Sequence, residues 1–387
     1  MVKAIKVMLI PNNVQKTKMF QYAGASRFAY NWALAREIEN YEKGGKFLSD
    51  AELRKEFTKL RHSDEYAWLL NISNNVTKQA IKDACTAYKN FFKGLQKFPR
   101  FKSRKRSMPK FYQDNVKIQF SNTHVKFEGF SSSRKANKQK KNWVRLAEHG
   151  RIPTDVKYMN PRISFDGLNW WISVCVEFPD CRETLNDDGV GIDLGIKDLA
   201  ICSDGTKYKN INKSQKVKKL EKQKRRLQRS ISRSYEKNKK GESYCKTNNV
   251  IKKEKLLLKR NHRLTNIRKN YLNQTISEIV NRKPRFICIE DLNVSGMMKN
   301  RHLSKAVQEQ GFFWFRKQLE YKCSDKGIQL IVADRFYPSS KLCSCCGNIK
   351  KDLKLSDRVY RCACGNMIDR DFQASINLKT YGEKFAS

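Results

Sequence analysis

Three acidic residues lie within or at the end of short apolar runs, or where a helix is predicted to begin. Asp193 lies inside one apolar run, Glu290 closes another, and Asp371 falls in the first turn of a helix predicted to start near Asp369. Carboxylates fixed on rigid elements of this kind can hold two divalent cations on either side of a scissile phosphate. The residue types therefore indicate metal-dependent phosphodiester hydrolysis.

Each acid taken alone is weak support for such a site. An acid that flanks an apolar strand is usually a solvated strand end, and an aspartate at a helix start such as Asp369 is usually an N-cap. The three acids together follow the order of an RNase H-like fold, which places one acid on its first strand, one at the end of its central strand and one on a late helix. That order favours a nuclease centre over three unrelated surface acids.

Two cysteine pairs, C-x-x-C and C-x-C, are separated by fifteen residues, and a glycine follows each pair. Glycine there permits the tight turn that directs backbone N–H groups at a thiolate sulfur. The pattern is typical of a structural zinc ribbon with four thiolate ligands, and it favours zinc over a thiol redox pair. Cys345 offers a competing thiolate beside the first pair. The predicted zinc ligands are Cys343, Cys346, Cys362 and Cys364.

The charge of the chain indicates the class of partner. Lys and Arg total 80 against 38 Asp and Glu, which leaves a formal charge of +42 on 387 residues. The cations are spread through every segment and interleaved with aromatic residues, as in proteins that bind polyphosphate backbones. We therefore expect a nucleic-acid-binding protein. Because no stretch approaches the ~20 apolar residues of a membrane span, we also expect it to be soluble and cytoplasmic, with no membrane partner.

The elements that must position these residues can be read from apolar periodicity. A first strand is predicted at Lys3–Ile10, helices follow to about Phe92, and alternating residues then predict hairpins around Ser121-Asn122 and Asp166-Gly167. A helix from Asn75 to Phe92 has polar residues on its outward face. The first part of the chain is thus predicted to be a small β-barrel that a helical insertion interrupts after its first strand.

The second part of the chain reads differently. Two short strands are predicted around Asp193, then a long basic segment in which apolar residues recur about every seven positions. That segment predicts an antiparallel helical hairpin turning near Gly241. A strand at Phe286–Glu290, a helix around Phe312–Tyr321 and a strand at Ile328–Ala333 follow before the cysteines. The overall fold class is α/β plus β-barrel.

At this point the sequence resembles the TnpB family, transposon-encoded RNA-guided DNA nucleases related to the type V CRISPR effectors. The segment GIDLGIKDLAICSDG resembles the first RuvC motif of that family, and ICIEDLNVSGMMKNRHLSKA resembles the second. DRFYPSSKLCSCCG and YRCACGNMIDRDFQASINL resemble its zinc element and third motif, and FKGLQKFPRFKSRKR resembles its N-terminal half. The shortened second cysteine pair is the one departure from the family pattern.

The resemblance implies an RNase H-like (RuvC) nuclease domain with an inserted zinc ribbon, preceded by a β-barrel called the wedge that carries a helical recognition insertion. The predicted domains are the wedge at 1–10 and 95–182, the recognition insertion at 11–94, the RuvC domain at 183–339 and 367–387 with a basic helical hairpin at 207–280, and the zinc ribbon at 340–366.

The resemblance also implies cofactors and partners. Asp193 would bridge two Mg²⁺ ions, while Glu290 and Asp371 would each hold one, and a structural Zn²⁺ would occupy the four cysteines. A guide RNA from the transposon end would direct cleavage of double-stranded target DNA next to a short transposon-adjacent motif. We expect a monomer with one RNA. The predicted nucleic-acid contacts are Lys78, Gln79 and Lys82, on the outward face of the helix from Asn75 to Phe92, and Arg370.

Three alternatives share part of this pattern. A nuclease-inactive RNA-guided DNA-binding repressor would resemble the same family, although the presence of all three acids argues against it. An RNase H-like transposase would also carry three acids, but it would not need a zinc ribbon just before the last one. A zinc-ribbon transcription factor explains the charge and the cysteines and leaves the acids without a role.

Overall fold

The computed structural model describes residues 1–130, 142–179, 182–354 and 357–386. The chain divides into two compact units, Met1–Pro179 and Asp180–Ser387. We refer to them as unit 1 and unit 2 and describe each by itself. Within the described ranges, no helix is both long enough and apolar enough to span a membrane.

Unit 1 is built on one antiparallel sheet of seven strands. Their order is β2-β6-β7-β1-β5-β4-β3, so that the N-terminal strand lies in the middle and pairs with β7 and β5. Both predicted hairpins are confirmed, as β3–β4 and β6–β7. The strands are β1 (Val2–Ile10), β2 (Lys110–Tyr112), β3 (Gln119–Phe120), β4 (His124–Lys126), β5 (Trp143–Leu146), β6 (Tyr158–Phe165) and β7 (Trp170–Glu177).

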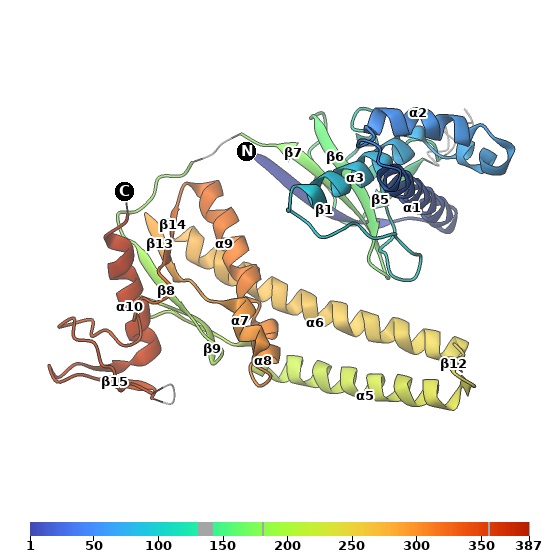
Figure 1. Ribbon diagram of the computed structural model, residues 1–387. Helices are drawn as coiled ribbons and strands as arrows, with labels where there is room; N and C mark the ends of the chain where they lie inside the picture. The colour runs from blue at the N-terminus through green and yellow to red at the C-terminus, as the bar shows by residue number, and fades with distance from the viewer. Residues whose placement is uncertain (131–141, 180–181, 355–356, 387) are drawn as a thin grey trace. The chain divides into compact units, whose positions relative to one another are not determined.

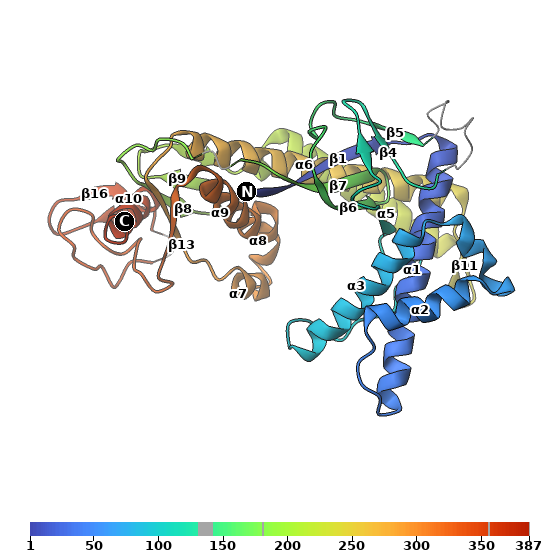
Figure 2. The same cartoon turned by 90° about the horizontal axis from the view of Figure 1, so that it is seen from above.

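The predicted helical insertion after the first strand is also confirmed. Capping boxes define two helix starts, since Asn12 exchanges hydrogen bonds with Gln15 and Ser49 with Glu52. The helices pack on one another beside the sheet (Figure 2), and their buried faces join the sheet in one apolar core. They are α1 (Asn13–Glu42), α2 (Asp50–Arg61), the 3-10 helix η1 (Asp64–Asn71) and α3 (Asn74–Phe92).

Unit 2 contains a mixed sheet of five strands in the order β10-β9-β8-β13-β14. The three strands β8 to β10 form an antiparallel meander, and β13 runs parallel to both β8 and β14. The strand bounds are β8 (Val190–Leu194), β9 (Asp198–Cys202), β10 (Lys207–Lys209), β13 (Phe286–Glu290) and β14 (Gln329–Ala333).

Helices cover both faces of this sheet (Figure 1). Ile192 of β8 and Ile289 of β13 pack in one core with α6 (Asn248–Asn281) and α9 (Phe312–Lys326). The alternate residues of β13 face the other way and pack against α10 (Arg370–Glu383). Because side chains alternate along a strand, each residue of β8 and β13 is assigned to one of these two faces.

A long helical hairpin extends from the sheet (Figure 1). It consists of α5 (Gln215–Lys237) and the N-terminal part of α6, which pack through a small apolar cluster of Val217, Leu220 and Leu264. The turn carries β11 (Lys239–Lys240) and β12 (Ser243–Tyr244), on either side of Gly241 as predicted. The remaining elements are the 3-10 helix η2 (Ile211–Lys213), α7 (Val294–Lys299), α8 (Ser304–Gln310), β15 (Val359–Arg361) and β16 (Met367–Asp369).

The contact between α10 and the sheet depends on glycine. A Cβ atom at Gly191 of β8 would overlap the backbone of Ser375 and Lys379 in α10, and a Cβ at Gly382 would overlap the ring of Phe286. The helix backbone therefore lies directly on the strands, at a distance that no side chain at these positions would permit.

We expect Gly191→Ala to lower the free energy of unfolding of unit 2 by at least about 1–3 kcal/mol, because the neighbour that must move is helix backbone. Thermal unfolding of the full chain measures the effect. Gly24→Ala in α1 is the matched control, since a Cβ there meets nothing within 4 Å. Alanine in a helix is favoured over glycine by up to about 1 kcal/mol, so this variant is expected to be slightly stabilised. Equal stability of both variants would contradict the close contact.

Candidate functional site

Asp193 and Glu290 lie side by side on neighbouring parallel strands. The register pairs Ile192 with Ile289, so the residues that follow them, Asp193 and Glu290, are adjacent. Asp193 shares its face of β8 with Gly191, and that glycine contacts α10. Both carboxylates therefore project from the face of the sheet that α10 covers, at the carboxyl ends of the strands.

The direction of α10 places Asp371 at the same end of the sheet. Ser375 and Lys379 lie over Gly191, whereas Gly382 lies over Phe286 at the start of β13. The first turn of α10, which contains Asp371, therefore points toward the ends of β8 and β13. Asp369 caps this helix by accepting hydrogen bonds from the backbone N–H groups of Asp371 (3.1 Å) and Phe372 (3.0 Å), as an N-cap does.

The electrostatics of the three acids follow from this placement. Burial, followed by the charges of Glu290 and Asp371, raises the pKa of Asp193 well above its ordinary value. Burial also raises the pKa of Glu290, against the opposing effect of Arg370. Like charges held together in a partly desolvated site disfavour the ionised forms. A cation bound between these carboxylates would favour the ionised forms instead.

The three acids are neighbours without forming a tight cluster. Among the described residues, the four cysteines are the one group of three or more metal-ligating side chains whose ligand atoms all lie within 4.8 Å of one another. Three carboxylates that held two ions would not need to form such a cluster, because the ions of such a site lie about 3.5–4 Å apart. The donor set of three carboxylates suits Mg²⁺, which prefers hard oxygen ligands.

The cysteines form a second site in unit 2. The Sγ atoms of Cys343 and Cys364 lie 3.7 Å apart, and those of Cys346 and Cys362 lie 3.5 Å apart. Although burial opposes it, hydrogen bonding by the backbone N–H groups of Cys346 and Cys345 and by the Asn366 amide lowers the pKa of the Cys343 thiol to about 6. The thiolate, which is the form that binds metal, is thereby favoured.

Glycine shapes both turns of the cysteine segment. Gly347 and Gly365, which follow the two pairs, have φ angles of +73° and +87°. Other residues rarely adopt this left-handed conformation, so the turns expected from the sequence are confirmed. Cys345 is exposed and lies outside the four-cysteine group.

Buried amides join the cysteine segment to α10. Gln373 and Asn377 are almost completely buried and both donate side-chain hydrogen bonds to the carbonyl oxygen of Leu342, at 2.8 Å and 2.7 Å. Gln373 also accepts a hydrogen bond of 3.0 Å from Asn366, next to the second cysteine pair. The segment that carries the cysteines is therefore fixed to the helix that carries Asp371.

The other residues predicted to contact nucleic acid have different surroundings. Lys78 and Lys82 are exposed on α3 in unit 1. Gln79, on the same helix, is half-buried and donates a hydrogen bond of 2.9 Å to Asp83. Arg370 in unit 2 is half-buried near Asp193 and Glu290, and its guanidinium donates to the carbonyl oxygen of Lys354 at 2.9 Å. Contact of these four with nucleic acid stays a prediction.

The sequence reasoning missed a group of residues beside Glu290. Asp291 accepts hydrogen bonds from Arg316 (2.8 Å) and Arg335 (2.6 Å), and these three residues with Glu290 line a cavity of about 300 Å³. The guanidinium group of Arg335, together with that of Arg316, holds the pKa of Asp291 below its ordinary value, although burial opposes this. The pair Glu290-Asp291 was the available signal in the sequence, but the arginines come from segments 25 and 44 residues away.

Comparison with known protein families gives three matches along the chain. Residues 312–378 match a model described as "Cas12f1-like, TNB domain", and residues 173–301 match a model described as "Probable transposase". Residues 1–46 match a model described as "Helix-turn-helix domain", although in this chain they contain the strand β1 and the single long helix α1.

Individual proteins match over almost the whole chain. An Escherichia coli protein named "Putative RNA-guided DNA endonuclease InsQ" is 31% identical over 93% of this chain and 87% of its own length. A Streptomyces pristinaespiralis protein of the same description, without the name InsQ, is 29% identical over 98% of this chain and 89% of its own.

A cryo-EM structure of a Cas12f1-sgRNA-target DNA complex aligns with a TM-score of 0.58 and 13% identity, covering 94% of this chain and 83% of that one. This likeness concerns the fold alone, which the chain shares with that Cas12f1 protein. The sequence matches extend over the motifs that carry the three acids and the four cysteines, and together they show that the chain belongs to the TnpB family.

Proposed function

We propose that this protein is an RNA-guided DNA endonuclease associated with a transposon. The observation that carries the proposal is the placement of Asp193, Glu290 and Asp371 at one end of the sheet in unit 2, next to the first turn of α10. The relatives named as RNA-guided DNA endonucleases support the substrate class. The charge of +42 supports nucleic acid as the partner.

In this proposal the nuclease depends on two Mg²⁺ ions. Asp193, Glu290 and Asp371 would hold them. The bound ions supply charge stabilisation and a nucleophile at neutral pH. The protein's own part is to place the carboxylates: α10 fixes Asp371, and the strand register fixes the other two. Arg370 partly offsets the burial that raises the pKa of Glu290.

The two units have separate roles in this proposal. Unit 1 corresponds to the wedge barrel with its recognition insertion, whose α3 surface at Lys78, Gln79 and Lys82 contacts the short transposon-adjacent motif. Unit 2 corresponds to the RuvC domain, whose single site cleaves both strands of the target DNA, together with the structural zinc ribbon. A guide RNA from the transposon end selects the target by base pairing, and one monomer holds one RNA.

We expect Asp193→Asn to abolish cleavage of guided double-stranded DNA while RNA binding is retained. Bound metal ions stabilise the charge of the transition state by several kcal/mol. Losing one of their ligands is therefore expected to lower the cleavage rate by at least about a hundredfold. Cleavage of a plasmid target by the purified protein with its RNA measures the effect, and Glu290→Gln and Asp371→Asn are expected to behave alike.

Asp188→Asn is the matched control, because Asp188 lies at the opposite end of the same strand segment and its side chain is 91% exposed. It is expected to cleave like the wild type. Undiminished cleavage by Asp193→Asn would show that the site is misassigned. Joining of transposon ends by the wild-type protein, without guided cleavage, would instead support an RNase H-like transposase.

The second metal in this proposal is a structural zinc held by the four cysteines. We expect about one zinc per chain in the purified protein, and we expect Cys343→Ser to lose it because that thiolate is the buried one. Elemental analysis measures the metal, and limited proteolysis between residues 341 and 367 measures the order of the segment. Cys345→Ser, the matched control, is expected to keep the zinc. The opposite pattern in the two variants would refute the ligand assignment.

A further inference from the structure

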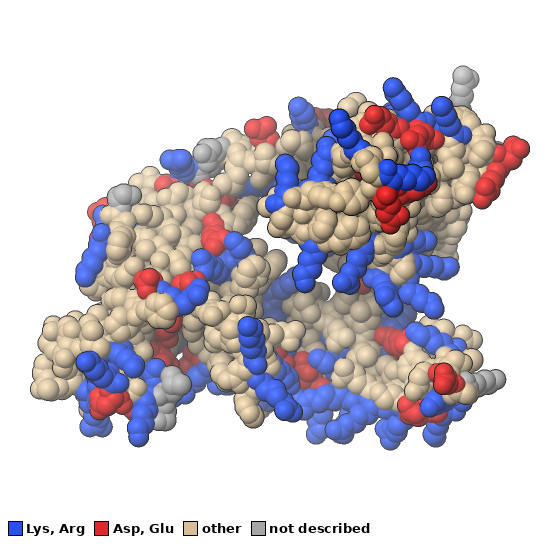
Figure 3. Space-filling model, in the orientation of Figure 1, with Lys and Arg blue, Asp and Glu red and all other residues tan. Residues whose placement is uncertain are grey.

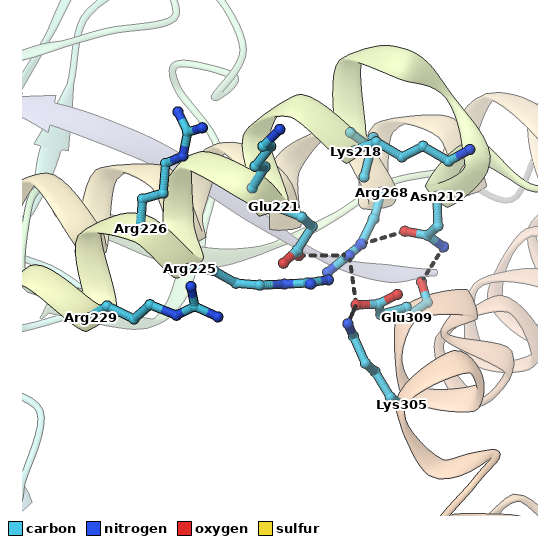
Figure 4. Close-up of a pocket in the computed structure, with 11 residues that line it drawn as sticks. Asn212, Lys218, Glu221, Arg225, Arg226, Arg229, Arg268, Lys305 and Glu309 are labelled. Atoms are coloured by element: carbon cyan, nitrogen blue, oxygen red, sulfur yellow. Dashed lines mark hydrogen bonds and ion pairs between the residues drawn. The ribbon is translucent and has the colours of Figure 1, made fainter.

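A cavity of about 550 Å³ lies beside the helical hairpin of unit 2 (Figure 4). Cationic side chains from three helices line it: Lys218, Lys222, Arg225, Arg226 and Arg229 from α5, Arg268 from α6, and Lys305 from α8. We call this cavity, with its cationic lining, the α5 groove. It is built from helices outside the strands and the helix that carry the three acids.

Four of the cations of α5 form one stripe. Positions 218, 222, 225 and 229 are spaced by four, three and four residues, so they recur on one face of the helix over about 16 Å. All four side chains are exposed. Blue side chains gather along the lower edge of Figure 3, where α5 lies. A row of cations with this spacing can contact successive phosphates along one nucleic-acid strand.

The acids in the groove do not neutralise the stripe. Glu221 lies 3.2 Å from both Lys224 and Arg268, and Glu309 lies 3.3 Å from Arg268 and 3.8 Å from Lys305. Figure 4 shows Arg268 held between these two carboxylates. Arg268 is therefore engaged in ion pairs within the protein and is not available to a ligand.

The stripe itself has no ionic partner within the described part of the chain, since none of Lys218, Lys222, Arg225 and Arg229 takes part in an ion pair there. Burial would raise the pKa of Glu221, but Lys224 and Arg268 outweigh it and hold that pKa below its ordinary value. Glu221 thus stays ionised and committed to its own partners, and the stripe presents unbalanced positive charge.

This arrangement favours a ligand that stays bound over one that binds only transiently. Like charges three or four residues apart destabilise a helix by roughly 0.2–0.5 kcal/mol per pair. The stripe contains three such pairs in sequence, 218/222, 222/225 and 225/229. A polyanion that remains in place throughout the reaction offsets this repulsion in every working state of the protein, whereas a transient DNA target does so only during cleavage.

We propose that the α5 groove binds the sugar-phosphate backbone of the guide RNA. This inference rests on the proposed function, because that function supplies the permanently bound RNA. The groove contacts phosphates and not base edges: its free groups are ammonium and guanidinium groups, which recognise phosphate charge regardless of sequence.

The test uses the full-length protein and the RNA that copurifies with the wild type, sequenced and then transcribed in vitro. The triple variant Lys222→Gln, Arg225→Gln, Arg229→Gln removes three cations of the stripe. The dependence of log affinity on log salt concentration is expected to be less steep by about two to three, since each lost phosphate contact lowers that slope by about 0.7–0.9. At saturating RNA, cleavage of target DNA is expected to persist.

The matched control is Lys216→Gln, Lys219→Gln, Arg233→Gln, which removes three exposed cations of the same helix that do not line the groove. For this control variant, the slope of log RNA affinity against log salt concentration is expected to change by less than about one. An equal change in both variants would mean a general effect of charge and would overturn the assignment. Circular dichroism verifies that both variants keep the helical content of the wild type.

Two other outcomes are decisive. If the groove variant binds RNA like the wild type, while its RNA complex loses affinity for target DNA, the groove belongs to DNA and the inference is wrong. If the wild type binds the RNA but does not cleave guided DNA, the proposed function fails, and the RNA-binding slopes of the two variants still decide whether the groove holds RNA.

Discussion

The placement of α10 directly on the sheet is the contact on which both sites of unit 2 depend. Gly191 and Gly382 allow helix backbone to lie against β8 and Phe286. This fixes the first turn of α10, with Asp371, at the strand ends that carry Asp193 and Glu290. Gln373 and Asn377 of the same helix hold the cysteine segment through Leu342. One helix thus positions an acid of the first site and the backbone of the second.

That placement opposes the electrostatic stability of the folded chain. Three carboxylates converge where burial already raises the pKa of Asp193 and Glu290. Arg370 compensates only in part, since its guanidinium is also engaged with the carbonyl oxygen of Lys354. A fold selected for stability alone would separate these charges or pair them. Their placement at one end of a sheet supports the proposed site, in which a cation is the remaining partner.

The sequence predicted the elements better than the contacts between them. Local patterns sufficed for β13, for α3 and for the helical hairpin, because apolar periodicity and capping residues are properties of neighbouring positions. Contacts between distant segments left no such pattern. The partnership of Asp291 with Arg335 spans 44 residues, and the α5 groove requires Lys305 of α8 to lie beside α5. The convergence of the acids was predictable only because their order matches a known fold.

The helical hairpin is tied to the strand that carries Asp193 by more than chain connectivity. Arg268 of α6 joins Glu221 of α5 to Glu309 of α8. The next residue, Gln310, is buried and donates a hydrogen bond of 2.8 Å to the carbonyl oxygen of Gly195, two residues beyond Asp193. A displacement of the hairpin is therefore transmitted to α8, and through α8 to the end of β8. Because these bonds are buried or half-buried, such coupling resists screening by salt better than a surface ion pair would.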